Sequence, residues 1–206
     1  ALHGRFGRLP MADVLAPAVR YARDGFPMTP VIARGFAANL AAFERHMPLI
    51  EEFDNARKTY YAGGSPQAGD VFRNPDLARS LETIGREGRG AFYKGGLAKT
   101  MDAYMARIGG DLRYADLAAH KGEWVVPASV NYRGVDVYEL PPNGQGYAAL
   151  QMLSILKNVD LGRWPRGSSE VFHYMVEAKR LAFEDLAKFY ADADFVDMDY
   201  QRLLHD

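Results

Sequence analysis

The segment from residue 135 to 153 constrains the fold more than any other, because it reads VDVYELPPNGQGYAALQML. Its first six residues are rich in β-branched and aromatic side chains, as in a β-strand, and its last seven are mostly apolar and predict a helix. Between them, Pro141 and Pro142 stiffen the backbone, and Asn143-Gly144 is a turn pair that favours positive φ. The chain must therefore pass from a strand through a tight turn directly into a helix.

A second strand is expected just before this segment. The stretches WVVPASVNY and VDVYEL lie on either side of Arg133-Gly134, and a glycine-containing pair between two β-rich runs favours an antiparallel hairpin. We expect this hairpin at about residues 124–140. Proline has no backbone N–H to donate to a ladder, so Pro127 must lie on an edge strand or before the first ladder bond.

Capping residues followed by prolines predict where two helices start. Thr29-Pro30 and Asn74-Pro75 each place a capping side chain before a proline in the first helical position, so helices should begin at about residues 29 and 74. Apolar residues recur at helical spacing after both. The second helix should end at Gly88, which can adopt the left-handed cap conformation.

Two further features complete the N-terminal half. An earlier helix is expected at about residues 16–24, with Pro17 in its first turn and Gly25 at its end. Residues 54–73 are rich in Gly, Ser, Asn and Asp and show no apolar period. This composition predicts a long surface loop, and we expect it to be the most mobile segment.

More helices are expected both before and after the hairpin. LAKTMDAYMAR predicts an amphipathic helix ended by Gly109-Gly110, and YADLAAH predicts a short one. Beyond the Pro-Pro loop we expect a helix at about 147–157 and a long helix from Ser168. The apolar residues of the long helix form mostly one stripe: Phe172, Met175, Val176, Ala178, Leu181, Ala182 and Leu186.

Charge and composition exclude several classes of protein. The 206 residues carry a net charge of −1, and their basic residues are scattered, so no basic surface is expected to attract nucleic acid. No apolar run approaches the roughly 20 residues that cross a bilayer, so no membrane span is predicted. The chain has no cysteine, which excludes disulfides, thiolate nucleophiles and cysteine zinc sites. Both cytoplasmic and exported proteins can lack cysteine, so the compartment stays open.

Common catalytic signatures, such as GxSxG, HExxH, the P-loop and GxGxxG after a strand, are absent from the sequence. The histidines lack the spacing that places two ligands on one helix face, and we predict neither a metal nor a cofactor; they are His3, His46, His120, His173 and His205. Glu177, Glu184 and Asp185 alternate with basic residues on the last helix, which indicates a solvated, compensated face. An acid/base pair among these carboxylates is the alternative.

The loop PPNGQG supports two interpretations. Asn143, Gly144, Gln145 and Gly146 precede a helix start, where free N–H groups and the helix dipole can hold a carboxylate or an oxyanion. In the structural interpretation, the prolines and Asn143-Gly144 shape the turn, and Gly146 lets the helix pack closely against its neighbours. We favour the structural interpretation, and we retain the four residues as candidates for a substrate-proximal position.

Several long blocks of the sequence are distinctive in content and order. They are GRLPMADVLAPAVRYARDGFPM, NPDLARSLETIGREGRGAFYKGGLAKTM, GGDLRYADLAAHKGEWVVPASVNYRGVDVYELPPNGQG and EAKRLAFEDLAKFYADADFVDM. In this order they resemble the middle of the gamma-glutamyltranspeptidase family of N-terminal nucleophile hydrolases. Ala193 stands where that family commonly has proline.

The resemblance implies an α+β fold, in which this chain forms the helix-rich part of a four-layer αββα N-terminal-nucleophile hydrolase fold. It also implies a precursor that cleaves itself into a large and a small subunit, with the new N-terminal threonine of the small subunit as nucleophile and base. A γ-glutamyl or related amide would acylate that threonine, and water or an amine would release the product. The implied partners are the small subunit, the rest of the large subunit and a small-molecule amide substrate. An oligomer of processed protomers is allowed.

The chain lacks the family's T-T-H-x-S start of the small subunit, and its threonines stand in other contexts. By resemblance, residues 1–206 are an interior segment of the large subunit, mostly helical over 1–120, with the hairpin, the Pro-Pro loop and long helices over 121–206. No catalytic residue can be carried over to this chain, and the segment alone is predicted to be inactive.

The loop also departs from the family, because it reads NGQG where many members have serine-rich or glycine-pair versions. This departure leaves transferase activity and γ-glutamyl preference open. Three alternatives to an active γ-glutamyl enzyme are retained. The first is a related amidohydrolase or acylase with a non-glutamyl substrate. The second is a homologue that has lost catalysis and binds a ligand or partner. The third is that the 206 residues act alone as a helical binding domain.

Overall fold

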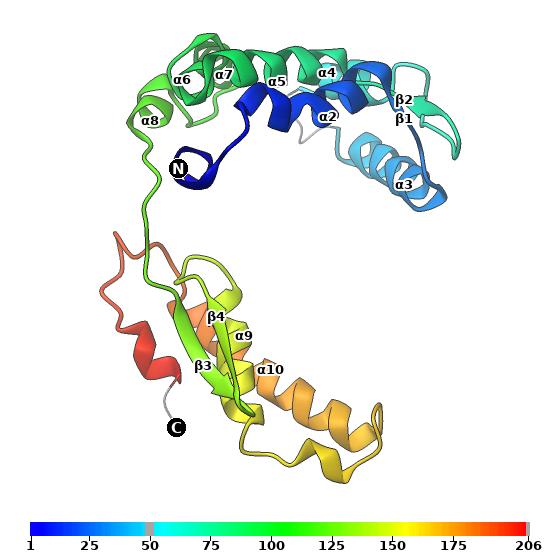
Figure 1. Cartoon of the computed structure of the whole chain (residues 1–206). Coiled ribbons are helices and arrows are strands. Elements are labelled where there is room, and N and C mark those ends of the chain that lie inside the picture. Colours follow the sequence, from blue (N-terminus) through cyan, green and yellow to red (C-terminus); the bar gives the residue numbers. More distant parts are fainter. Residues whose placement is uncertain (48–51, 205–206) are drawn as a thin grey trace. The chain divides into compact units, whose positions relative to one another are not determined.

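The computed structural model describes residues 1–47 and 52–204, and the chain divides between Gly122 and Glu123 into two compact units. Figure 1 labels the elements. The first unit contains α1 (Leu2–Phe6), α2 (Met11–Asp24), β1 (Phe26–Pro27), α3 (Pro30–His46), α4 (Asp54–Tyr60), β2 (Val71–Phe72), α5 (Pro75–Glu87), α6 (Arg89–Tyr93), α7 (Gly96–Arg107) and α8 (Tyr114–Ala119). The second contains β3 (Ala128–Tyr132), β4 (Val135–Glu139), α9 (Gly146–Leu156), α10 (Ser169–Phe189) and the 3-10 helices η2 (Leu161–Arg163) and η3 (Tyr200–Leu204).

The helix pair α2 and α5 forms the core of the first unit. Val19 and Ala22 of α2 are buried against Ala78 of α5. Small residues bring the two backbones close together, because a Cβ placed on Gly85 of α5 would lie only 3.1 Å from the Cα of Ala12 in α2. This spacing leaves no room for a larger residue unless one helix shifts.

Helix α2 starts earlier than the sequence predicts. It begins at Met11, so Pro17 lies in the helix interior and the expected start at about residue 16 is wrong. Pro17 cannot donate to the carbonyl one turn earlier, that of Asp13, but both residues are exposed and water can reach that carbonyl. The predicted end is confirmed, since the helix stops at Asp24 and Gly25 has φ 92°.

The predicted starts of α3 and α5 are confirmed. Thr29 Oγ1 accepts a hydrogen bond from the backbone N–H of Ile32 (3.3 Å), and Asn74 Oδ1 accepts one from Leu77 (2.9 Å). Each side chain therefore satisfies an N–H group that the first helical turn leaves without a partner. Helix α5 ends before Gly88, which has the positive φ expected of it (73°), although its ψ of −161° lies outside the left-handed helical region.

The prediction of a surface loop over the whole of residues 54–73 is wrong at both ends, although residues 62–69 are irregular and mostly exposed. This stretch contains helix α4 and strand β2, which pairs antiparallel with β1 through Phe26 opposite Phe72. Tyr61 is buried, and the ring of Tyr60 stacks on that of Phe72 with centroids 6.1 Å apart. Phe36 of α3 contacts the same rings. These aromatic contacts join residues distant in sequence, so the polar composition of the stretch does not reveal them.

The predicted hairpin is confirmed in the second unit. Strands β3 and β4 pair antiparallel, with Val130 opposite Val137 and Tyr132 opposite Val135. Arg133 and Gly134 form the two-residue turn with φ of 54° and 87°, as a type I′ turn requires. Pro127 precedes the ladder, so it removes no ladder hydrogen bond.

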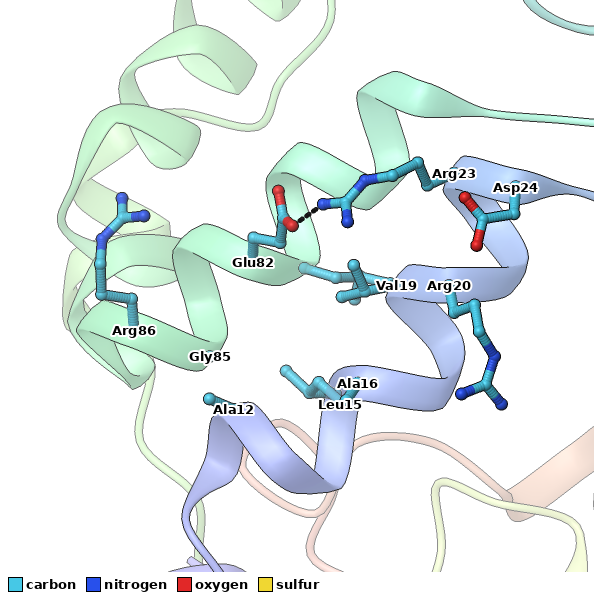
Figure 2. Close-up of a pocket in the computed structure, with 11 residues that line it drawn as sticks. Ala12, Leu15, Ala16, Val19, Arg20, Arg23, Asp24, Glu82, Gly85 and Arg86 are labelled. Atoms are coloured by element: carbon cyan, nitrogen blue, oxygen red, sulfur yellow. Dashed lines mark ion pairs between the residues drawn. The ribbon is translucent and has the colours of Figure 1, made fainter.

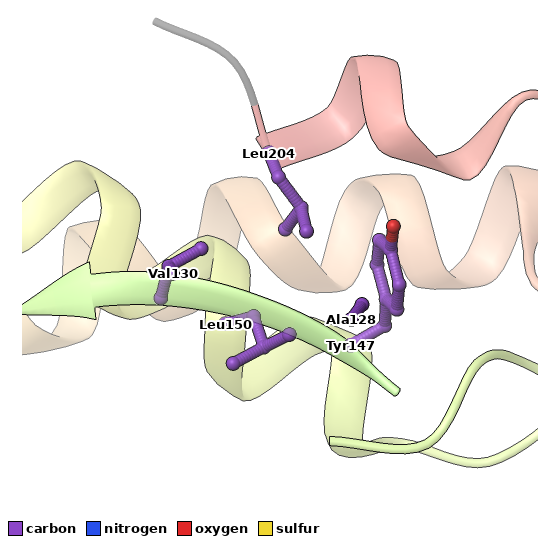
Figure 3. Packing of buried hydrophobic residues seen from close by; sticks show 5 residues of the cluster. All are labelled: Ala128, Val130, Tyr147, Leu150 and Leu204. Atoms are coloured by element: carbon purple, nitrogen blue, oxygen red, sulfur yellow. The ribbon is translucent and has the colours of Figure 1, made fainter. Parts of the chain in front are cut away.

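The hairpin packs against helix α9, which begins within a residue of its predicted start. Figure 3 shows the resulting core, in which side chains of β3, α9 and η3 meet. It consists of Ala128, Val130, Tyr147, Leu150 and Leu204, with Val137, Leu153, Tyr190 and Tyr200 packed against it. Helix α10 lies against α9 and begins after the predicted Ser168 cap, whose hydroxyl oxygen lies 3.5 Å from the N–H of Val171.

The apolar stripe predicted for α10 is only partly buried. Ala178 and Ala182 are buried in the face toward α9. The larger residues of the predicted stripe are mostly exposed: Phe172, Met175, Val176 and Leu181. Among the described residues, no helix combines the length and apolar character needed to cross a bilayer.

Candidate functional site

The loop of residues 141–146 joins β4 to α9 and presents three polar or small residues to solvent. Asn143, Gly144 and Gln145 are exposed, whereas Tyr147, one residue into the helix, is buried. Gly144 does not have positive φ, so the predicted reason for the Asn143-Gly144 pair is wrong. The turn is made with φ values open to any residue.

Gly146 has the close packing role predicted for it, and its neighbour is Glu139. A Cβ on Gly146 would lie 3.0 Å from the Cβ of Glu139 and still closer to the carboxylate of that residue. Glu139 ends strand β4 and is half-buried. The strand therefore delivers a carboxylate to the N-terminal end of α9, where the helix dipole favours negative charge.

This arrangement decides which chemistry the loop can support. Within the described residues, no hydrogen bond engages the side chains of Asn143 and Gln145 or the backbone N–H groups of Gly146 and Tyr147. These donors could hold a ligand oxygen, but the nearby charge of Glu139 repels a second free carboxylate. The side-chain amides offer both donors and acceptors, so a neutral amide fits this loop better than an anion does.

A second polar cluster connects α9 to α10, and sequence reasoning missed it. Gln151, which is 4% exposed, donates from Nε2 to Oδ2 of Asp185 (2.7 Å) and accepts a hydrogen bond from the hydroxyl of Tyr190. Burial raises the pKa of Tyr190 above its usual value, and the nearby Asp185 charge raises it further. Asp185 therefore belongs to a half-buried network, and the predicted solvated face is wrong at this residue. The partners of Gln151 lie 34 and 39 positions away in the sequence, so no local pattern predicts this cluster.

The same network borders a small cavity and lies near an unpaired hydroxyl. The cavity of about 240 Å³ is lined by Gln151, Ser154, Ile155, Asn158, Leu181, Ala182, Asp185 and Leu203. The hydroxyl of Tyr147 is buried without a hydrogen-bond partner. Its burial raises the pKa of Tyr147, and the charge of Asp199 adds to the rise. None of these groups is a nucleophile paired with an activating base, since the hydroxyl of Ser154 donates to the backbone carbonyl of Leu204.

A larger pocket of about 490 Å³ lies between α2 and α5 (Figure 2). Its apolar wall comes from Leu15, Val19 and Leu81, and an ion pair between Arg23 and Glu82 spans its edge. Arginines and carboxylates both border the pocket, so its charge is largely compensated. The pocket is a cavity between two helices, and its lining residues include no catalytic group.

The histidines take separate local positions. His3 Nε2 lies 2.8 Å from the carbonyl of Leu9, and the ring of His120 stacks on Tyr93 with centroids 5.1 Å apart. His173 contacts Tyr174, and His205 lies outside the described residues. In residues 1–47 and 52–204, no three His, Asp or Glu side chains gather as they would around a metal ion.

Comparison with known proteins gives these elements a context. A family model described as gamma-glutamyltranspeptidase matches residues 1–206. The glutathione hydrolase-like YwrD proenzyme of Bacillus subtilis is 38% identical over 199 residues, which cover 97% of this chain and 37% of that proenzyme. Several solved structures are similar in fold, including the following two. The cephalosporin acylase of Bacillus halodurans has a TM-score of 0.89 and 35% identity, and the matched region covers 100% of this chain and 38% of the acylase chain.

The second solved structure, gamma-glutamyltranspeptidase of Helicobacter pylori, has a TM-score of 0.87 and 27% identity, covering 98% of this chain and 57% of its own. The helix-rich α+β architecture is therefore that of the N-terminal nucleophile hydrolases. Within that class, the chain belongs to the gamma-glutamyltranspeptidase family. It spans little more than a third of the length of the curated relatives it matches.

Proposed function

We propose that the 206 residues are an interior, non-catalytic segment of the large subunit of a self-processing amidase of the gamma-glutamyltransferase type. The main support is that the family model matches residues 1–206, whereas the chain is only about a third as long as its curated relatives. Several of those relatives are named proenzymes. The whole, longer polypeptide is called the parent protein below. Its remaining two-thirds, outside these 206 residues, would then supply the nucleophile.

The four threonines of the chain support this assignment, because each lies in or caps a helix and none stands at a cleaved N-terminus. The hydroxyl of Thr29 caps α3, and those of Thr83 and Thr100 donate to backbone carbonyls one turn earlier (2.9 and 3.0 Å). Thr59 lies inside α4. In the parent protein, a threonine exposed by cleavage would use its own α-amino group, with a pKa of about 7.7–8.0, to accept the hydroxyl proton.

The loop of residues 141–146 would lie close to the substrate in this proposal. Its unpaired amides at Asn143 and Gln145 and the free N–H groups at the start of α9 are suited to contacts with an amide or peptide-like group. These contacts would position the substrate, whereas acylation would take place on a threonine outside the chain.

A second candidate function is amide hydrolysis with a non-glutamyl substrate. Its support is the likeness to the cephalosporin acylase, which has the higher identity and TM-score of the two solved structures described above. The carboxylate of Glu139 beside the loop also disfavours another free carboxylate at that place. The two candidates share the threonine chemistry and differ in the acyl group.

The test uses the parent protein. We expect it to separate into two chains on a denaturing gel, with threonine as the first residue of the shorter chain by mass spectrometry. Replacing that threonine by alanine should leave one uncut chain. Assays with a chromogenic γ-glutamyl anilide and with a panel of other acyl amides then separate the two candidates. An uncut wild-type protein that is silent on every amide would favour a binding homologue instead.

The loop is tested in the same parent protein. Asn143→Ala and Gln145→Ala should raise KM for the amide substrate about tenfold or less, as expected for the loss of one hydrogen bond. Both side chains are exposed, so the melting temperature should stay unchanged. Ser129→Ala, an exposed change on β3, is the matched control. Unchanged kinetics in both loop variants would remove the loop from the substrate site.

A further inference from the structure

Helix α10 has two apolar faces, of which only one is covered by its own unit. At about 100° per residue, Ala178 and Ala182 point in nearly the same direction, and this direction is the face packed on α9. A second set of apolar residues lies roughly 60–180° further around the helix: Met175, Leu186, Phe172, Phe183, Val176 and Ala187. We call these six residues the outer apolar face.

The outer apolar face is largely open to solvent. Phe172 is 57% exposed, Val176 51%, and Met175 and Phe183 just over 40%. The arc opposite the packed face is polar and contains His173, Glu177, Arg180 and Glu184, and Leu181, which is 59% exposed, lies between this arc and the packed face. A helix that borders water on one side needs an apolar stripe of about 100°, whereas the two apolar faces of α10 together cover roughly twice that arc. One apolar face is therefore in excess.

The chemistry of the face restricts what can cover it. It combines two phenylalanines, a valine and a methionine with one cation, Lys179, whose ammonium lies 4.9 Å from the ring centroid of Phe183. A matching surface must be apolar and must offer a carboxylate or carbonyl acceptor near this ammonium. Exposed single apolar residues are common, but a continuous face of this kind marks an interface.

We propose that the outer apolar face of α10 is an internal interface, covered by a surface of the parent protein outside these 206 residues. We choose this occupant because the curated relatives are about three times as long as this chain. A parent protein of that length would contain the polypeptide that covers the face. The proposal rests on the proposed function only in that this chain is a segment of a longer protein. Catalytic activity is not required for it.

The test uses accessibility of single cysteines, which is convenient because these 206 residues have no cysteine of their own. Val176→Cys and Phe183→Cys probe the outer apolar face, and Glu184→Cys on the polar arc is the matched control. Any cysteines elsewhere in the parent protein are first replaced by serine. Each variant is alkylated with a maleimide under native conditions and again in guanidinium, and the 206-residue chain is treated in parallel.

In the native parent protein, we expect alkylation at positions 176 and 183 to be at least about tenfold slower than at position 184, with equal rates in guanidinium. In the 206-residue chain, once circular dichroism has shown a cooperative unfolding transition, the two face positions should react as fast as the control. Val176→Cys changes side-chain size little, so it keeps the test informative where Phe183→Cys fails to fold.

Three results would overturn the proposal. The first is an equal alkylation rate at all three positions in the native parent protein. The second is that positions 176 and 183 are as strongly protected in the 206-residue chain as in the parent protein. The third is protection that disappears when an oligomer of the parent protein is diluted to monomer. The last result would assign the face to a second copy of the protein. Protection in a parent protein that neither cleaves itself nor acts on amides would reject the proposed function and leave the interface standing.

Discussion

Gln151 of α9 donates a 2.7 Å hydrogen bond to Asp185 of α10, and the two residues are joined across the contact between the two helices. The amide oxygen of Gln151 accepts from Tyr190 at the same time. One buried side chain therefore pairs with both a carboxylate and a phenol, each on a half-buried residue. Because Gln151 is 4% exposed, water cannot readily replace it.

Replacing Gln151 by leucine should destabilise the parent protein by about 2 kcal/mol, because a hydrogen bond to a charged group is lost and two groups remain unpaired. The measurement is the midpoint of denaturant unfolding. Glu184→Gln, an exposed change one residue from Asp185, should move the midpoint little. Equal midpoints for the two variants would show that the network does not stabilise the fold.

Gly146→Ala tests the close approach of β4 to α9. The new methyl group meets the side chain of Glu139, so we expect a loss of about 1 kcal/mol in the free energy of unfolding. Gly144→Ala is the control, since no atom lies within 4 Å of its Cβ position and its φ is not positive. The double variant Glu139→Ala with Gly146→Ala should recover most of the loss, and failure to recover would point to another cause.

Gly25→Ala should be among the most damaging small changes in the first unit. Gly25 has φ 92°, and a Cβ there would lie 2.5 Å from Val71 Cγ1 and 2.7 Å from the carbonyl oxygen of Phe72. Strain and overlap together predict a loss of about 3 kcal/mol. Gly35→Ala, in the open interior of α3, should instead stabilise by up to about 1 kcal/mol. Thermal melts of both variants check the contrast.

Buried tyrosines predict a loss of stability at alkaline pH. The pKa values of Tyr147 and Tyr190 are raised in the folded state, so the neutral phenols are favoured by folding. Their contribution is complete below the unfolded-state pKa of about 10 and is lost as pH rises from there through the folded-state pKa. Tyr190→Phe should flatten this alkaline fall, whereas Tyr138→Phe, at a 63% exposed position, should not. Unfolding curves between neutral and alkaline pH provide the measurement.

Features fixed by neighbouring residues could be predicted from the sequence. The caps at Thr29 and Asn74 and the turn at Arg133-Gly134 depend on residues two or three positions apart, and each occurs where it is predicted. Pro17 shows the limit of such rules. Its unfavourable place inside α2 is compensated by the packing of that helix on α5, which no local signal contains.

The candidate site shows the same division. The strand, turn and helix around residues 141–146 follow from local sequence, and so does the need for a small residue at Gly146. The carboxylate of Glu139 beside the helix start depends on how far β4 extends before the loop. The pairing of Gln151 with Asp185 spans 34 positions, so it requires the folded arrangement of α9 and α10.

The packing of α2 on α5 also affects how the chain is made. The 50 residues from 25 to 74 separate the two helices, so α2 is synthesised well before its partner. At about 5–20 residues per second, the apolar side of α2, with Leu15 and Val19, waits on the order of 3–10 s for α5. During synthesis, the apolar side of α2 is therefore open to a chaperone until α5 has been made.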